Sequence, residues 1–123
     1  MVDSGETADV MTYFYCTGFG KFGNVLENPT SRLIQNLPEL LKKVPENDKF
    51  FKLRHTEIIT VAIQDCDQTV ERIYNMVAQQ HGDADRHIII NFGVAASRSC
   101  YSLEGRGKNW MHFGCPDERG QAP

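Results

Sequence analysis

The feature that most constrains this fold is an alternation of predicted strands and helices. A β-branched and aromatic run at residues 11–16 predicts a first strand, and one or two strands are expected within residues 50–63. The apolar run at residues 88–92 is typical of a strand buried on both faces of a sheet. Because helical segments separate these strands, the order favours an α/β fold with a parallel sheet.

The first predicted helix follows an Asn-Pro pair. Asn28 suits the N-cap, and Pro29 suits the first turn. Pro38 interrupts the apolar pattern, so we expect the helix to kink there, or to end and restart. The apolar face comprises Leu33, Ile34, Leu37, Leu40 and Leu41.

A second helix is predicted from about residue 67 to residue 80. Asp67 or Thr69 would supply its N-cap. Its apolar stripe comprises Val70, Ile73, Tyr74 and Val77.

The chain of 123 residues has the length of one domain. We expect residues 1–10, which are polar, to be a disordered N-terminus. Residues 105–123 carry four of the ten glycines and predict a long loop. Because such a loop is typical of a functional segment whose continuation is missing, we expect a single, incomplete α/β domain.

Charge and hydrophobicity argue against two classes of partner. The net charge of -3 shows no basic stripe for nucleic acid. No apolar run approaches the roughly 18 to 20 residues of a membrane-spanning helix. Three acidic residues within the first ten argue against a secretory signal, so we expect a cytoplasmic protein.

The four cysteines are widely spaced, which favours reduced thiols over a disulfide framework. Among possible metal ligands, only His112 and Cys115 have suitable spacing, and one such pair cannot form a zinc site. We therefore expect no metal.

Three glycines after the first strand match a dinucleotide-binding pattern. They are Gly18, Gly20 and Gly23. However, the helix signal begins only at Asn28, and two phenylalanines fill positions between the glycines. No acidic residue ends a clear second strand about 20 residues further on, so the dinucleotide interpretation is disfavoured.

The fuller string at residues 16–30, CTGFGKFGNVLENPT, resembles the N-terminal signature of pyroglutamyl peptidase type I. In that family a strand leads into a TGFxPFG loop and then an Asn-Pro pair. Lys21 departs from the family's proline, which would leave the loop less rigid. Residues 68–73 resemble the start of the family's second helix. Residues 90–94, followed by residues 102–104, resemble its strand, glycine turn and active-site glutamate. The resemblance spans about residues 11–104.

The resemblance implies a three-layer α/β/α sandwich with a mostly parallel sheet, of which this chain is the N-terminal portion. It also implies a cysteine peptidase that removes N-terminal pyroglutamyl residues from peptides without a cofactor. Glu104 matches the glutamate that orients the catalytic histidine. A surface glutamate at a strand end is the alternative.

The resemblance also implies a substrate pocket. Phe19 and Phe22 match aromatic residues that line the slot for the lactam ring, and Gln68 and Val94 are candidates for its rim. Either phenylalanine could instead fill the core beneath the loop. Arg119 is a further candidate near the oxyanion site, but the preceding loop differs from the family in length.

The family's nucleophilic cysteine and histidine have no match in this chain. Cys100, Cys115 and His112 do not fit the family's order and spacing, and Cys100 is expected to be a strand thiol that behaves as a small apolar residue. Three interpretations follow: a truncated peptidase, an inactive homologue that binds pyroglutamyl ends or a partner chain, or an unrelated α/β ligand-binding module. Self-association is compatible with each.

Overall fold

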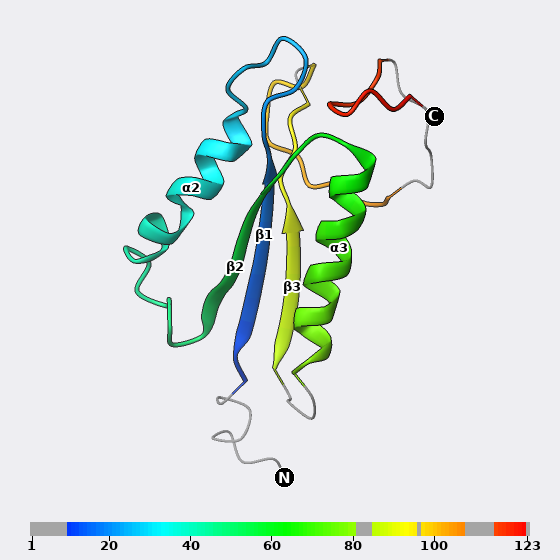
Figure 1. Cartoon of the computed structure of the whole chain (residues 1–123). Coiled ribbons are helices and arrows are strands. Elements are labelled where there is room, and N and C mark those ends of the chain that lie inside the picture. The colour runs from blue at the N-terminus through cyan, green and yellow to red at the C-terminus, as the bar shows by residue number, and fades with distance from the viewer. Residues whose placement is uncertain (1–9, 81–84, 96, 108–114, 123) are drawn as a thin grey trace.

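The computed structural model describes residues 10–80, 85–95, 97–107 and 115–122. Strands and helices alternate along it, which confirms the predicted α/β fold (Figure 1). The order is β1 (Thr12–Phe19), α2 (Pro29–Leu41), β2 (Phe51–Ile59), α3 (Ile63–Ala78) and β3 (Arg86–Asn91). Within the described part, no helix combines the length and the apolar character needed to cross a membrane.

The sheet is parallel, and β1 is its central strand. The strand order is β2-β1-β3, so the chain crosses from one edge of the sheet to the other after β2. Tyr15 pairs in register with His55 on β2 and with Ile89 on β3. As a result, all three strands place their carboxyl ends at the same edge of the sheet.

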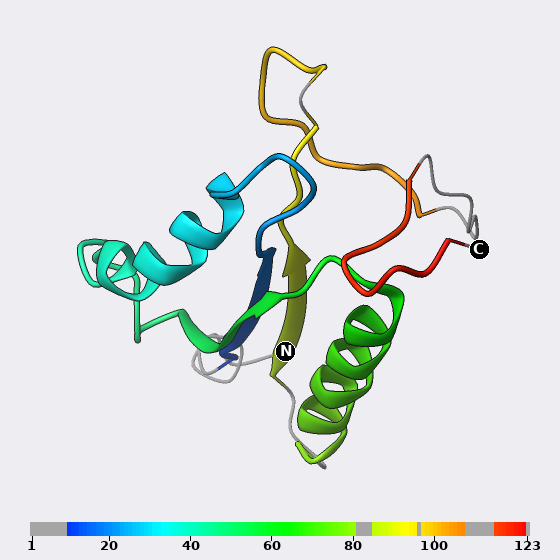
Figure 2. The same cartoon turned by 45° about the horizontal axis from the view of Figure 1, so that its top comes forward.

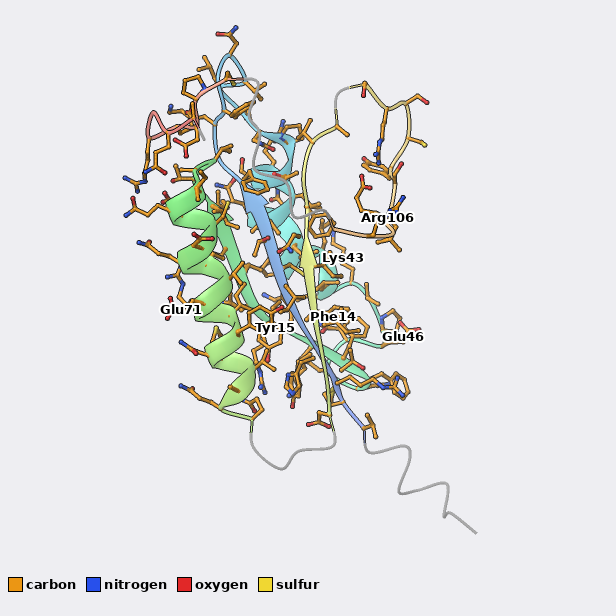
Figure 3. The ribbon with its side chains drawn as sticks, turned by 90° about the vertical axis from the view of Figure 1, so that its right-hand side faces the viewer. Phe14, Tyr15, Lys43, Glu46, Glu71 and Arg106 are labelled. Atoms are coloured by element: carbon orange, nitrogen blue, oxygen red, sulfur yellow. The ribbon has the colours of Figure 1, made fainter. Side chains whose placement is uncertain are left out.

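The two helices lie on opposite faces of this sheet (Figure 2). Gly18 faces α2, since a Cβ atom built on it would meet Ile34. The neighbouring residues Thr17 and Phe19 instead line a groove beneath α3. Figure 3 shows the same alternation two residues earlier in β1, where Tyr15 lies on the α3 side of the sheet. Both faces of β1 are therefore covered by helices near the carboxyl end of the strand, which explains why the residues there are apolar or small.

Helix α2 begins as the sequence predicts. Asn28 is the N-cap, its side-chain oxygen accepts a hydrogen bond from the Thr30 amide at 3.0 Å, and Pro29 opens the first turn. Of the two alternatives expected at Pro38, an end and restart was wrong, because the helix continues to Leu41 with Pro38 inside it. Pro38 lies in the last turn, so its ring removes a single helical hydrogen bond and the helix ends three residues later.

Two element boundaries differ from the prediction. Strand β1 does not stop at residue 16 but continues to Phe19, since Thr17 and Gly18 pair with β2. Helix α3 begins at Ile63, four residues before the predicted start, and neither Asp67 nor Thr69 caps it. Its cap is described with the site below. Only one strand, β2, forms within residues 50–63.

The prediction that residues 88–92 are buried on both faces was wrong. Among the described residues β3 pairs only with β1, and Ile88 is 40% exposed. The apolar stripe of α3 is covered in part: Ile73 is 2% exposed, whereas Val70 and Tyr74 are 51% and 61% exposed. The continuous apolar sequence of β3 therefore forms an edge strand, and the described residues cover it only in part.

A polar cluster joins α3 to β2. Glu57 accepts a hydrogen bond from the Thr69 hydroxyl at 2.7 Å, and it also bonds to Arg72 and to His55, whose Nε2 lies 2.8 Å from the carboxylate. The Arg72 guanidinium lowers the pKa of Glu57 to about 2, and hydrogen bonds from His55 and Thr69 act in the same direction. Burial of the carboxylate acts in the opposite direction. Thr69 thus anchors the side of the helix instead of capping its end.

The close approach of α2 to β1 makes Gly18 sensitive to substitution. A Cβ atom at position 18 would lie 2.7 Å from the Thr30 carbonyl oxygen and 2.8 Å from Ile34. We expect Gly18→Ala to lower the free energy of unfolding by about 1–3 kcal/mol in urea denaturation. At Gly20 the nearest atom would be 3.8 Å away, so Gly20→Ala is the matched control. Equal stability of the two variants would contradict this packing.

The Glu57 cluster makes stability depend on pH. Because folding lowers the pKa of Glu57 from 4.5 to about 2, its contribution is complete above about pH 4.5 and disappears as the pH falls toward 2. After allowance for solvent screening this contribution is about 1–2 kcal/mol. We expect Glu57→Gln to lose it at pH 7 and to show a weaker decline in stability between pH 4.5 and pH 2.5. Urea titrations at several pH values measure both effects, and an unchanged pH profile would refute the assignment.

Candidate functional site

By topology, the binding edge of this sheet lies at the carboxyl ends of β1 and β3. The connection after β1 leads to β2 on one side of β1, and the connection after β2 crosses to β3 on the other side. The strand order therefore reverses between β1 and β3. Ligands of open α/β sheets bind outside the strand ends at such a reversal. The two ends are joined there by a 2.7 Å hydrogen bond from the Thr17 hydroxyl to the Asn91 side-chain oxygen.

The segment that follows β1, residues 20–28, is called the glycine loop below. Phe22 and Val25 exchange two backbone hydrogen bonds of 3.0 and 2.8 Å around a tight turn. Gly23 has φ of +52° in that turn, a conformation that favours glycine. At the end of the loop the Asn28 amide group donates to the Gly20 carbonyl at 3.1 Å, so the loop closes on itself.

Thr30 fastens this loop to the sheet. The Phe19 amide donates to the Thr30 hydroxyl oxygen at 2.8 Å, and that hydroxyl lies 2.7 Å from the N-cap oxygen of Asn28. The end of β1 and the start of α2 are therefore held by one threonine. Gly18 lies inside the strand and the helix starts well after Gly23, so the dinucleotide-binding turn is not formed.

Residues 115–122, called the C-terminal segment below, cap α3 from a distance in sequence. One Asp117 oxygen accepts from the Ile63 amide at 3.0 Å, and the other accepts from the Arg119 and Gln121 amides at 2.9 Å each. Asp117 is only 8% exposed. A carboxylate at a helix N-terminus satisfies free amides and interacts favourably with the helix dipole.

Sequence inspection missed this cap because Asp117 lies 54 residues from Ile63. Arg119 also has a structural partner, since its guanidinium binds Asp65 through two hydrogen bonds of 2.5 and 3.0 Å. Arg119 lowers the pKa of Asp65 through these bonds. Arg119 is thus engaged in fastening the C-terminal segment to α3.

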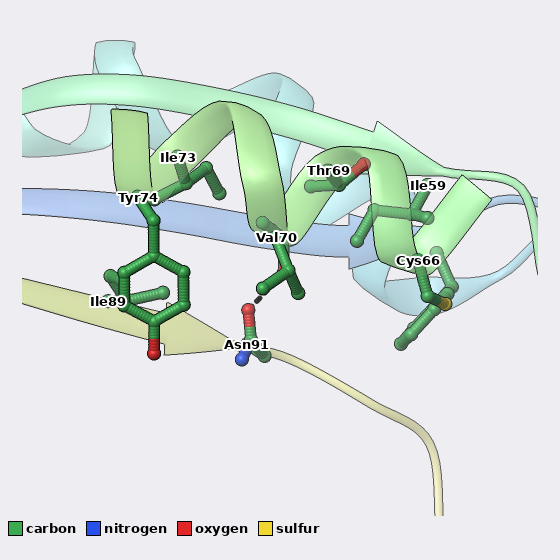
Figure 4. A pocket seen from close by; sticks show the side chains of 10 residues that line it. Ile59, Cys66, Thr69, Val70, Ile73, Tyr74, Ile89 and Asn91 are labelled. Carbon is green, nitrogen blue, oxygen red and sulfur yellow. Dashed lines mark hydrogen bonds between the residues drawn. The ribbon is translucent and has the colours of Figure 1, made fainter. Parts of the chain in front are cut away.

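A groove of about 380 Å³ lies between α3 and the ends of the strands (Figure 4). Its walls are mostly apolar, with Thr17, Thr69 and Asn91 as the polar groups, a composition common in small-molecule sites. The apolar lining comprises Phe19, Ile59, Cys66, Val70, Ile73, Tyr74 and Ile89. Burial raises the pKa of the Cys66 thiol, so it lacks the thiolate character of a nucleophile.

The candidate pocket residues occupy different parts of this edge. Phe19 lines the groove, while Phe22 lies on the glycine loop and is 38% exposed. Val94 follows β3 and is 52% exposed. Gln68 is exposed on α3 and is not part of the groove lining, which includes its neighbour Thr69.

Glu104 is exposed and forms an ion pair with Arg98 at 2.7 Å. Its side chain is 69% exposed. Across the described ranges, no hydrogen bond or ion pair joins Glu104 to the glycine loop. The carboxylate therefore lies outside the bonded network that links Phe19, Asn28 and Thr30.

Cys100 and Cys115 are exposed. The expected strand around Cys100 was wrong, because residues 97–107 form no strand to bury the thiol. His112 and residues 1–9 lie outside the described residues. Among those described, no group of three or more histidine, cysteine, aspartate or glutamate residues could hold a metal ion.

Comparisons with protein-family models, with curated proteins and with solved structures find no match for this chain.

The remote cap can be tested by substitution. We expect Asp117→Ala to lower the Tm by about 3–8 °C, because the amide of Ile63 and two amides of the C-terminal segment lose their acceptor. Asp67→Ala is the matched control, since Asp67 is exposed on α3 and does not cap it. Thermal unfolding followed by circular dichroism measures both variants. A larger loss for Asp67→Ala would overturn the assignment.

Proposed function

We propose that this chain is the N-terminal, ligand-holding part of a pyroglutamyl peptidase type I-like cysteine peptidase. The observation that carries the proposal is the single hydrogen-bonded unit built by residues 16–30. In it, Thr30 and Asn28 tie the glycine loop to the end of β1. These are the residues of the string that resembles the family signature, and the unit stands at the edge where α/β sheets bind ligands.

The proposed ligand is the pyroglutamyl end of a peptide. Its lactam is a flat, uncharged ring that suits an apolar slot with a few hydrogen bonds to its N–H and C=O groups. Phe19 in the groove and Phe22 on the loop would supply apolar contacts, with Val94 and Gln68 at the rim. The loop backbone would supply the polar contacts.

Turnover requires groups that this chain does not match. In the complete enzyme a cysteine thiolate would attack the pyroglutamyl carbonyl and expel the peptide amine, and water would then release pyroglutamate from the thioester. A histidine would take the thiol proton and pass it to the leaving amine, and Glu104 would orient that histidine. No organic cofactor or metal enters this scheme. The three-layer sandwich and a cytoplasmic location belong to the same proposal.

A second candidate is a binding protein without catalysis. The Glu104–Arg98 ion pair favours it, because the carboxylate proposed to orient a base already has a cationic partner in solvent. Such a protein would use the same loop to hold pyroglutamyl ends. The two candidates differ in turnover and not in ligand.

Binding can be measured by isothermal titration of the full chain with pyroglutamyl-alanine. We expect saturable binding, and no binding of prolyl-alanine, whose charged amine would be desolvated in an apolar slot. Phe22→Ala should weaken affinity by about tenfold, which corresponds to roughly 1.4 kcal/mol of lost apolar contact. Leu26→Ala, at an 80% exposed position of the same loop, is the control. Absence of pyroglutamyl-alanine binding would refute both candidates.

We expect the 123-residue chain alone to show no hydrolysis of a pyroglutamyl reporter, because the cysteine and histidine of the family have no match. Hydrolysis that vanished in Cys100→Ala would contradict this expectation.

A further inference from the structure

The glycine loop is held by a carboxylate that lies almost one hundred residues away in sequence. Glu118 accepts a hydrogen bond from the Lys21 ammonium at 2.8 Å, and its second oxygen lies 3.5 Å from the Gly23 amide nitrogen. The Glu118 side chain is 18% exposed, whereas that of Lys21 is 69% exposed. Lys21 lowers the pKa of Glu118, in agreement with this pairing.

The main chain that carries Glu118 is itself firmly attached. Its amide donates to the Val61 carbonyl at 2.9 Å, just before α3. The residues on either side are fastened as well, with Asp117 at the helix N-terminus and Arg119 on Asp65. The carboxylate is therefore presented from a fixed backbone, so little main-chain entropy is lost when it binds Lys21.

The contact with Glu118 adds to other attachments of the loop. The Gly20 amide donates to the Ile59 carbonyl at 2.9 Å, and internal hydrogen bonds join Phe22 to Val25 and Asn28 to Gly20. None of these bonds is made by the Lys21 side chain or by the Gly23 amide. Glycines on both sides of this stretch raise the entropy that ordering costs. An exposed ion pair alone stabilises little, but here one partner is mostly buried and pre-positioned, and it reaches the loop at two residues.

We infer that Glu118 is a positioning residue that orders the glycine loop through Lys21 and Gly23. The inference deepens the proposed function, on which it rests for the identity of the ligand: ordering Phe22 before the ligand arrives would lower the entropic cost of binding. The C-terminal segment and the glycine loop then form one ligand-holding edge. They are far apart in sequence, because the loop follows β1 and the C-terminal segment comes after β3.

Amide hydrogen exchange of the full chain tests the inference without any ligand. We expect Glu118→Gln to speed exchange of the Phe22 and Val25 amides by about tenfold, while the Ile73 amide of α3 keeps its rate. Glu27→Gln is the matched control, because Glu27 lies on the same loop and pairs with exposed Arg32 at 3.3 Å. Unchanged exchange at Phe22 and Val25 would overturn the inference.

Lys21→Met gives the same test from the other partner and leaves the C-terminal segment intact. If Glu118→Gln unfolds the chain, faster loop exchange in Lys21→Met still supports the inference, and unchanged exchange overturns it. Additivity of the two substitutions in the double variant would also overturn it, since residues that act through one contact couple in a double-mutant cycle.

A rescue separates positioning from general destabilisation. The Lys21 amide donates no hydrogen bond within the described residues, and its φ is not positive. Proline can therefore replace it and restrict the backbone directly. We expect Lys21→Pro to restore slow exchange in Glu118→Gln, and to restore pyroglutamyl-alanine affinity lost by that variant. Failure of the rescue would count against positioning.

If exchange responds as expected and no variant binds pyroglutamyl-alanine, the positioning stands and the proposed function fails.

Discussion

The structure depends on the burial of β1 between two neighbouring strands and two helices. Tyr15 and Thr17 are completely buried, and Gly18 allows the first turn of α2 to lie against the strand. Parallel strands cannot be joined by a tight turn, so successive strands are linked by crossover connections, and both crossovers here contain a helix. Once β1 is central, α2 and α3 are placed on opposite faces, and the carboxyl ends of the strands meet at one edge.

That edge is assembled from segments that are distant in sequence. Thr30 ties the glycine loop to β1, Asp117 caps α3, and Glu118 reaches Lys21. Each contact supplies a hydrogen-bond or charge partner for a group that would otherwise have none at the end of a strand or helix. The same contacts give the loop a defined shape, which a binding site needs and which a glycine-rich segment does not have by itself.

The covered and uncovered parts of the sheet differ in a way that bears on the proposed function. Ile34, Ile59 and Ile73 are buried around β1, whereas Ile88 on β3 and Tyr74 on α3 remain substantially exposed. The proposal of a larger sandwich would place further structure against β3. Such structure would also be the source of the cysteine and histidine that the proposed reaction requires.

Local sequence determined the element types, the cap at Asn28 and the turn around Gly23, because these depend on neighbouring residues and on backbone conformations that few residue types adopt. The family resemblance directed attention to Phe19, Phe22 and Glu104, but their roles remain predictions. Only the tertiary structure decided that β3 lies at a thinly covered edge, that Asp117 caps α3 and that Glu118 holds Lys21. These contacts join residues 54 and 97 positions apart, and such pairings arise from packing that no local pattern encodes.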